Sequence, residues 1–138
     1  MTTRVLFLCT HNAARSQMAE GLLRHTAGNR FEVESAGTAP TDVHPLAVAV
    51  MREIGIDVSG QRAKDVSEIE GHPDIVITLC EEATESCPVF LGAPRFLHWN
   101  LPDPAAARGD EAAAIAVFRQ IRDSLALLIR EFIEGVEE

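Results

Sequence analysis

The feature that most constrains this chain is the run Cys-Thr-His-Asn-Ala-Ala-Arg-Ser at residues 9–16. The four apolar residues before it predict a buried strand, and a stretch with helical periodicity follows it. A loop between a strand and a helix directs backbone N–H groups toward an anion. We therefore predict an oxyanion site in which Arg15 binds two oxygens and Cys9 lies beneath the central atom as a thiolate.

Cys9 has weaker interpretations that the surrounding residues disfavour. A lone cysteine at the end of a strand is commonly an inert core residue. An arginine six positions later, followed by serine and a helix, favours the anion loop. A Walker-type phosphate loop is excluded, because residues 9–16 contain no glycine and lack the Gly-Lys-Ser/Thr ending. Asn12 is then the residue best suited to a left-handed backbone conformation in this loop.

Strand-length apolar runs alternate with helix-length stretches, which favours a parallel sheet covered by helices. Strands are predicted at residues 4–9, 31–35, 75–79 and 95–99. Helices are predicted at residues 16–27 with Ser16 as N-cap, at 45–54, and from residue 110 onward. Apolar residues at spacings of three and four predict one core-facing stripe on the last helix: Ile115, Phe118, Ile121, Leu125, Leu128 and Phe132. The 138 residues form one α/β domain, residues 1–138, without repeats or linkers.

Charge and cysteine content exclude several classes of protein. The net charge of −9 argues against a nucleic-acid partner, so any attraction for an anion must come from Arg15 and oriented amides. No apolar stretch approaches the roughly 20 residues that span a bilayer, and we expect a cytoplasmic protein with no membrane contact. Three cysteines in a reducing compartment predict reactive or buried thiols rather than a disulfide framework.

The run from Cys9 to Glu20 resembles the low-molecular-weight protein tyrosine phosphatase family, and especially its arsenate reductase branch. The resemblance covers nearly the whole chain, including residues 35–37 and the Asp-Pro pair at 103–104. We accordingly predict a four-stranded parallel sheet in the order 2-1-3-4, flanked by helices on both faces. The resemblance implies these site residues: Cys9 as nucleophile, Arg15 with the loop residues Thr10, His11, Asn12, Ala13 and Ala14 as oxyanion binders, Ser16 as thiolate stabiliser, and Asp103 as general acid.

A second group of thiols follows the third predicted strand, where Cys80 and Cys87 are separated by a hydrophilic segment. A zinc site is the rival interpretation, but the ligand spacing does not match and no second Cys/His pair follows. In the mechanism that the resemblance implies, Cys9 attacks arsenate, Cys80 attacks the Cys9 sulfur to release arsenite, and Cys87 then attacks Cys80. Thioredoxin reduces the final disulfide in the related enzymes.

The residues after Asp103 bear on the choice between the two branches. Tyrosine phosphatases of the family present aromatic side chains there, whereas this chain has alanine at 105, 106 and 107 and contains no tyrosine. Small residues suit a small inorganic anion, arsenate or phosphate. We predict a monomeric, thioredoxin-dependent arsenate reductase. The alternatives are a phosphatase acting on phosphate monoesters and a non-catalytic redox or oxyanion sensor.

The resemblance also implies, in one branch, a monovalent cation site for an ion such as potassium. Its ligands would be Asn12, Glu20, Ser35 and Asp65. Oxygen ligands suit a hard cation. The alternative, which we favour, is that these residues hydrogen-bond to one another and brace the loop.

The histidines carry weaker predictions. His11 stands where related enzymes often have glycine, and it either adds positive charge near the anion or, as we favour, points to solvent. We predict a structural role for His98. No function is assigned to three further histidines on predicted surface turns, His25, His44 and His72.

Overall fold

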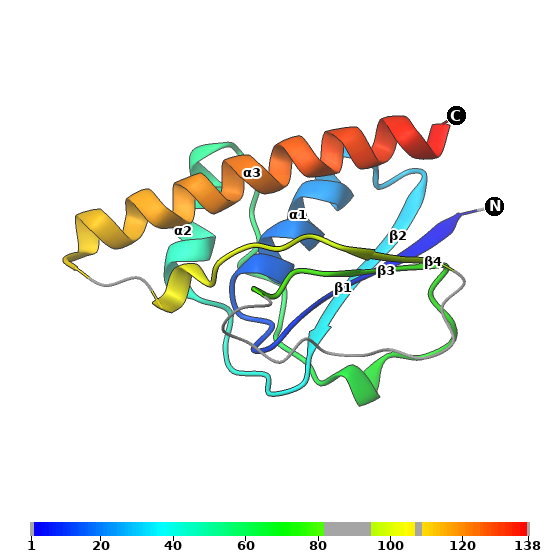
Figure 1. Ribbon diagram of the computed structural model, residues 1–138, viewed down its shortest axis with the longest axis horizontal. Helices are drawn as coiled ribbons and strands as arrows, with labels where there is room; N and C mark the ends of the chain where they lie inside the picture. The colour runs from blue at the N-terminus through cyan, green and yellow to red at the C-terminus, as the bar shows by residue number, and fades with distance from the viewer. Residues whose placement is uncertain (1, 82–94, 107–108, 138) are drawn as a thin grey trace.

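The computed structural model describes residues 2–81, 95–106 and 109–137, and its centre is a four-stranded parallel sheet (Figure 1). Its strands are β1 (Thr3–Cys9), β2 (Phe31–Gly37), β3 (Ile75–Thr78) and β4 (Arg95–His98). They are hydrogen-bonded in the order β2-β1-β3-β4. The predicted fold class and strand order are confirmed.

Three helices pack together on one face of the sheet: α1 (Arg15–Ala27), α2 (Pro45–Glu53) and α3 (Glu111–Glu137) (Figure 1). The opposite face is covered by the short 3-10 helix η1 (Val66–Glu68). A second 3-10 helix, η2 (Pro104–Ala106), precedes α3. Within the described residues, the second face of the sheet thus carries a 3-10 helix. The segment 82–94, between β3 and β4, lies outside the described residues.

β1 is buried on both faces because it lies in the middle of the sheet, which explains its continuous apolar sequence. Successive side chains of a strand point to opposite faces. Val5, Phe7 and Cys9 accordingly join the core beneath the α-helices, whereas Leu6 and Leu8 join a smaller cluster on the η1 face. Cys9 therefore emerges at the end of β1 on the same face as α1.

The prediction that Ser16 caps α1 is wrong. The N-cap residue is Ala14, and no side chain makes a capping hydrogen bond there. The hydroxyl group of Ser16 is engaged instead by the Cys9 sulfur and the Asn12 side chain. A serine beside an ordered loop has partners other than the helix amides, so its residue type alone did not determine its role.

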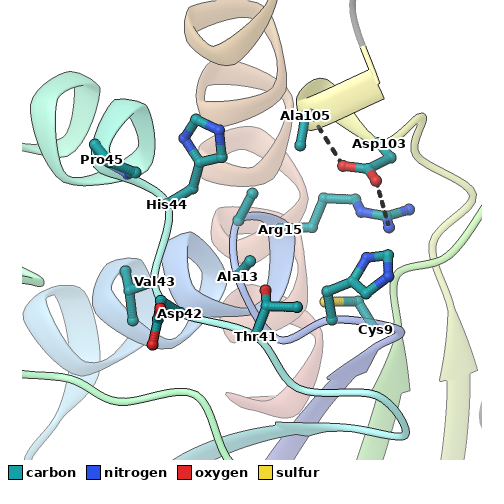
Figure 2. Close-up of a pocket in the computed structure, with 12 residues that line it drawn as sticks. Cys9, Ala13, Arg15, Thr41, Asp42, Val43, His44, Pro45, Asp103 and Ala105 are labelled. Carbon is teal, nitrogen blue, oxygen red and sulfur yellow. Dashed lines mark hydrogen bonds and ion pairs between the residues drawn. The ribbon is translucent and has the colours of Figure 1, made fainter.

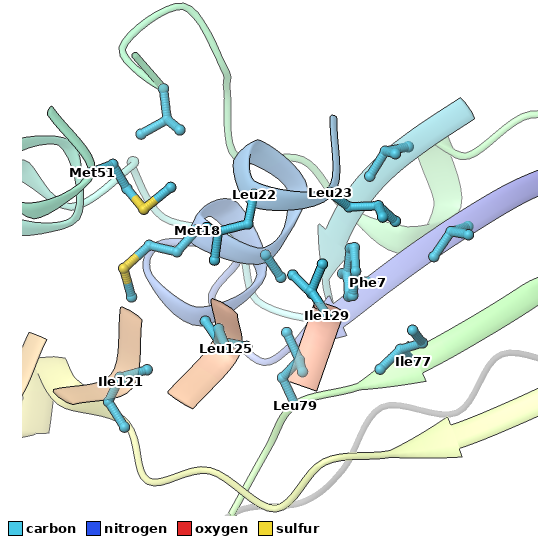
Figure 3. Close-up of a cluster of buried hydrophobic side chains, with 14 of the residues drawn as sticks. Phe7, Met18, Leu22, Leu23, Met51, Ile77, Leu79, Ile121, Leu125 and Ile129 are labelled. Atoms are coloured by element: carbon cyan, nitrogen blue, oxygen red, sulfur yellow. The ribbon is translucent and has the colours of Figure 1, made fainter. Parts of the chain in front are cut away.

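The predicted apolar stripe of α3 faces the core. Figure 3 shows Ile121, Leu125 and Ile129 directed toward side chains of α1 and the sheet, and all three are buried. Residues three and four apart share one face of a helix, which produces this stripe. In the part of the chain that the structure describes, none of the helices combines the length and apolarity needed to cross a membrane.

Ion pairs between side chains fasten α2 to α3. The Glu53 carboxylate accepts hydrogen bonds from Arg119 at 2.7 Å and from Arg122 at 2.8 Å. These bonds, first from Arg119 and then from Arg122, lower the pKa of Glu53 to about 2. The carboxylate therefore stays charged far below neutral pH, and α2 keeps its position beside α3.

Replacing Leu125 by alanine should lower the free energy of unfolding by about 2–5 kcal/mol, because it leaves a cavity in a fully buried site. Leu127→Ala is the matched control on the same helix, since the Leu127 side chain is 55% exposed. Its effect should stay within about 0.5 kcal/mol. Urea unfolding followed by circular dichroism measures both, and equal losses in the two variants would contradict the assignment of this core.

Candidate active site

A cavity of about 230 Å³ opens at the carboxyl edge of the sheet, beyond the end of β1 (Figure 2). Open α/β sheets place their ligand sites at this edge. The loop of residues 9–15 forms one side of the cavity. Residues 41–45 form a second wall, and Asp103 and Ala105 form a third. The predicted oxyanion loop therefore borders a real cavity.

The carbonyl groups of the loop are held on its outer side by the segment 39–44. The bonds are Ala39 N–H to Thr10 O at 2.9 Å, Thr41 N–H to His11 O at 3.0 Å, and His44 N–H to Ala13 O at 2.9 Å. A planar trans peptide directs its C=O and its N–H to opposite sides. The N–H groups that follow these carbonyls, on residues 11, 12 and 14, therefore point to the inner side of the loop.

Asn12 adopts the predicted left-handed conformation, with φ of 49°. Its side chain is completely buried and fully hydrogen-bonded. The Lys64 N–H donates to Asn12 Oδ1 at 2.9 Å, which fixes the orientation of the amide. Its Nδ2 group then donates to Ser16 Oγ at 2.7 Å and to Ser35 Oγ at 3.0 Å. These contacts fix the backbone turn without a glycine.

Ser16 joins the side chains of Asn12 and Cys9. Its Oγ accepts from Asn12 and lies 2.9 Å from the Sγ of Cys9. Because the amide group of Asn12 is the donor in the first bond, that bond leaves the Ser16 hydroxyl proton available for a thiolate at Sγ. A donated hydrogen bond favours a negatively charged sulfur over a neutral one.

Arg15 lies at the bottom of the cavity with 2% of its surface exposed. Its Nη1 donates to the carbonyl groups of Leu79 at 3.1 Å and Leu101 at 3.0 Å. These two bonds come from the loops after β3 and β4 and fix the plane of the guanidinium group. Figure 2 shows this group directed toward Asp103, so that its Nη2 remains at the cavity.

Asp103 is a turn residue whose carboxylate also reaches the cavity. Its Oδ1 accepts a hydrogen bond from the Ala105 N–H at 3.0 Å, as expected for a turn residue before η2. Its Oδ2 lies 4.0 Å from Arg15 Nη2, at the wall of the cavity. The turn thus presents one carboxylate oxygen to the same space as Cys9.

The first two predicted thiols follow neighbouring strands. Leu8 pairs with Thr78, and the Leu79 N–H donates to Leu8 O at 2.8 Å, so Cys9 and Cys80 both emerge at the same edge. Cys9 is a free thiol, whereas Cys80 is disulfide-bonded, and both are buried. Cys87 lies outside the described residues.

Three of the four residues considered for a cation are brought together, but they do not fit an ion. Ser35 donates to Glu20 Oε1 at 2.5 Å, and the guanidinium group of Arg24 already lies 2.6 Å from Glu20 Oε2. Asn12 presents its N–H group, and not its oxygen, to Ser35. Asp65 caps η1 by accepting from the Ser67 N–H. Nor do the described residues contain any group of three or more His, Cys, Asp or Glu side chains placed to hold a metal ion.

His44 contributes to the site although no role was predicted for it. It lines the cavity, its ring packs 4.7 Å from that of Phe118, and its Nδ1 accepts from the Leu46 N–H at 3.0 Å. It is the N-cap of α2. The signal was present in Pro45, since a proline in the first turn places the N-cap just before it.

The other histidines lie in several environments. His11 is exposed and lines the cavity. His98 pairs with Thr78 Oγ1 at 2.7 Å between neighbouring strands, which agrees with a structural role. His25 and His72 are exposed, the former within α1 rather than on a turn.

Comparisons with known proteins agree with this geometry. Residues 4–138 match the model of the low molecular weight phosphotyrosine protein phosphatase family. The chain is 40% identical over 131 residues to the arsenate reductase of Bacillus subtilis (strain 168), covering 94% of each. Its structure resembles an arsenate reductase in the phosphate binding state, with a TM-score of 0.81, 32% identity, and 97% of this chain and 98% of that chain covered.

A further structural neighbour is the thioredoxin-dependent arsenate reductase of Corynebacterium glutamicum. It shares 30% sequence identity with this chain, at a TM-score of 0.72. The match covers 99% of this chain and 62% of that chain.

Gly37→Ala tests the packing of the loop against β2. A Cβ at this position would lie 2.5 Å from Thr10 O and 2.8 Å from Cys9 O, both of which are backbone atoms that hold the loop. We expect a loss of about 1–3 kcal/mol in the free energy of unfolding and weaker protection of Cys9 by phosphate against alkylation. Gly60→Ala is the control, because nothing lies within 4 Å of its added Cβ. Unchanged protection in Gly37→Ala would show that the loop tolerates the shift.

Proposed function

The chain belongs to the low molecular weight phosphotyrosine protein phosphatase family, and within that family we propose that it reduces arsenate to arsenite. One observation carries the proposal: free Cys9 lines a cavity together with Arg15, while Cys80, at the end of the neighbouring strand, is oxidised. Hydrolysis of a phosphate ester needs one thiol and no redox change. A second thiol that forms disulfides beside the first is required when two electrons must be delivered.

The first step is the binding and attack of arsenate. Arg15 and the inward N–H groups of the loop bind the oxyanion, and the Cys9 thiolate attacks the arsenic atom. A sulfur–arsenic bond forms, and one arsenate oxygen leaves as water after taking up protons. Arsenic remains in the pentavalent state at this point. Ser16 supports this step because its hydroxyl lies 2.9 Å from Sγ and can donate a hydrogen bond to the thiolate.

The second step transfers the electrons. The thiolate of Cys80 attacks the Cys9 sulfur, the sulfur–arsenic bond breaks, and its electron pair stays on arsenic, which becomes trivalent and leaves as arsenite. The two sulfur atoms are oxidised to a Cys9–Cys80 disulfide. Cys9 and Cys80 lie at the carboxyl ends of the adjacent strands β1 and β3. Adjacent strands lie about 4.8 Å apart, so the two residues are close enough for such an attack.

The third step restores Cys9. The Cys87 thiolate attacks Cys80, which forms a Cys80–Cys87 disulfide and releases Cys9 as a thiolate. A dithiol reductant of the thioredoxin type then reduces this disulfide. The free Cys9 and the oxidised Cys80 of the structure support this order of events. Thioredoxin acts in a reducing compartment, so the proposal includes a cytoplasmic location.

A phosphatase activity on phosphate monoesters is a second candidate, and the position of Asp103 favours it. Its Oδ2 borders the cavity near Arg15, where a carboxylic acid could protonate the leaving oxygen of an ester. Arsenate loses only water, so Asp103 is less important for reduction. The wall beside it is formed by the small side chain of Ala105, which leaves room for a compact anion.

The single variants Cys80→Ser and Cys87→Ser separate the two candidates. Each should lose arsenate-dependent consumption of NADPH in the presence of thioredoxin and thioredoxin reductase, because the relay can no longer deliver two electrons to arsenic and be reduced again. Hydrolysis of p-nitrophenyl phosphate should persist in both variants. Cys9→Ser is the matched control and should lose both activities. Arsenite release over many turnovers in either Cys80→Ser or Cys87→Ser would refute the relay.

Replacing Asp103 by asparagine should reduce hydrolysis of p-nitrophenyl phosphate by about 100-fold, the effect typical of a lost general acid. Arsenate reduction should change by much less, since arsenate carries exchangeable protons of its own and its leaving oxygen departs as water. Initial rates of the two reactions, measured on one preparation of the variant, test this difference. Equal losses in both would assign Asp103 to the positioning of Arg15.

A further inference from the structure

Arg24 lies outside the cavity, on the last turn of α1, yet its guanidinium group joins three separate parts of the chain. Its Nη2 donates to Glu20 Oε2 at 2.6 Å and to the carbonyl of Val33 at 2.7 Å. Its Nη1 donates to Gln61 Oε1 at 3.1 Å. The planar fork of an arginine suits such divided contacts, which the single ammonium group of a lysine reproduces poorly.

The first chain of hydrogen bonds runs from Arg24 to the side chain of Asn12. Arg24 holds one oxygen of Glu20, and the other oxygen accepts from Ser35 Oγ at 2.5 Å. Ser35 Oγ in turn accepts from Asn12 Nδ2 at 3.0 Å. Ser35 is completely buried and Glu20 nearly so, which makes each of these bonds costly to break.

The second chain runs from Arg24 to the backbone of Asn12. Gln61, whose Oε1 accepts from Arg24, donates from Nε2 to Gln17 Oε1 at 2.7 Å. Gln17 Nε2 donates to Asn12 O at 2.9 Å. Two chains of hydrogen bonds therefore begin at the guanidinium group of Arg24. One ends at the side chain of Asn12 and the other at its backbone carbonyl group.

Charge gives Arg24 a second role at this position. The buried carboxylate of Glu20 is connected through Ser35, Asn12 and Ser16 to the sulfur of Cys9. A negative charge there disfavours a thiolate at the other end. The guanidinium group 2.6 Å from Glu20 compensates that charge.

We propose that Arg24 is a positioning residue for the oxyanion cavity, which orients Asn12 through both chains and compensates the charge of Glu20. Its effect is to keep the Ser16 hydroxyl in hydrogen-bond contact with the Cys9 sulfur and to keep the loop N–H groups directed toward the bound anion. The inference rests on the proposed roles of Cys9 and the oxyanion loop, but it does not require that arsenate be reduced.

Arg24→Gln tests the inference, with Arg62→Gln as the matched control. Arg62 carries the same charge nearby. Its side chain is 68% exposed, against 48% for Arg24, and it pairs with Glu68 at 3.1 Å rather than with Glu20. The readouts are the rate of Cys9 alkylation by iodoacetamide between pH 5 and pH 9, with the Cys9 peptide identified by mass spectrometry, and protection of Cys9 by inorganic phosphate. Thermal unfolding by circular dichroism confirms that each variant is folded.

In Arg24→Gln, we expect Cys9 alkylation near neutral pH to slow by roughly three- to tenfold, the effect typical of losing one of two interacting residues. The midpoint of the curve of alkylation rate against pH should rise. Phosphate protection should weaken by a similar factor, while Arg62→Gln stays within about twofold of the unmodified protein. A general loosening of the fold would expose the buried Cys9 and speed its alkylation, whereas the proposal predicts slower alkylation. Arg24→Gln values equal to those of Arg62→Gln overturn the proposal.

If Arg24→Gln does not fold, the pair Arg24→Lys and Arg62→Lys replaces it. Lysine keeps the charge and loses the fork, so phosphate protection should weaken by about threefold in Arg24→Lys alone. Equal protection in the two lysine variants overturns the role in positioning. Neither readout involves arsenate turnover, so a chain that fails to reduce arsenate but shows these effects would refute the proposed function and retain the inference.

Discussion

The site depends on one residue, Asn12, and on the left-handed turn that it holds with φ of 49°. This conformation costs a residue with a side chain about 1–2 kcal/mol. The cost is offset because Lys64, Ser16, Ser35 and Gln17 bind its side-chain oxygen, its side-chain nitrogen and its carbonyl. With Asn12 fixed, the other loop carbonyls reach the segment 39–44, and the loop N–H groups face the cavity.

The same arrangement would allow an acidic chain to bind the proposed oxyanion. The net charge of −9 repels anions at long range, so the attraction must arise locally. Arg15 supplies a full charge that two carbonyl groups hold in place, and the loop adds the partial charges of its N–H groups. On the far side, Arg24 compensates Glu20, which would otherwise oppose a thiolate at Cys9. A buried network of this kind is effective only when each member is satisfied.

Much of the fold and part of the site could be predicted from the sequence, and the errors have physical causes. The strand order, the stripe of α3 and the left-handed Asn12 were expected and are observed. The capping role of Ser16 was wrong because a serine near a helix start also has loop partners. His44 was overlooked because its place in the cavity wall depends on how α2 packs against Phe118.

The sequence by itself determined the strand–loop–helix unit that carries Cys9 and Arg15, and the placement of Cys80 after a strand. These features follow from local periodicity and from residues a few positions apart, which a single chain displays directly. Only the tertiary structure decided that Asn12 is held by Lys64 and Ser35, and that the cation beside Glu20 is Arg24, itself joined to Gln61. Several of these contacts join residues tens of positions apart, whose proximity depends on the packing of the whole sheet and is not encoded in any local pattern.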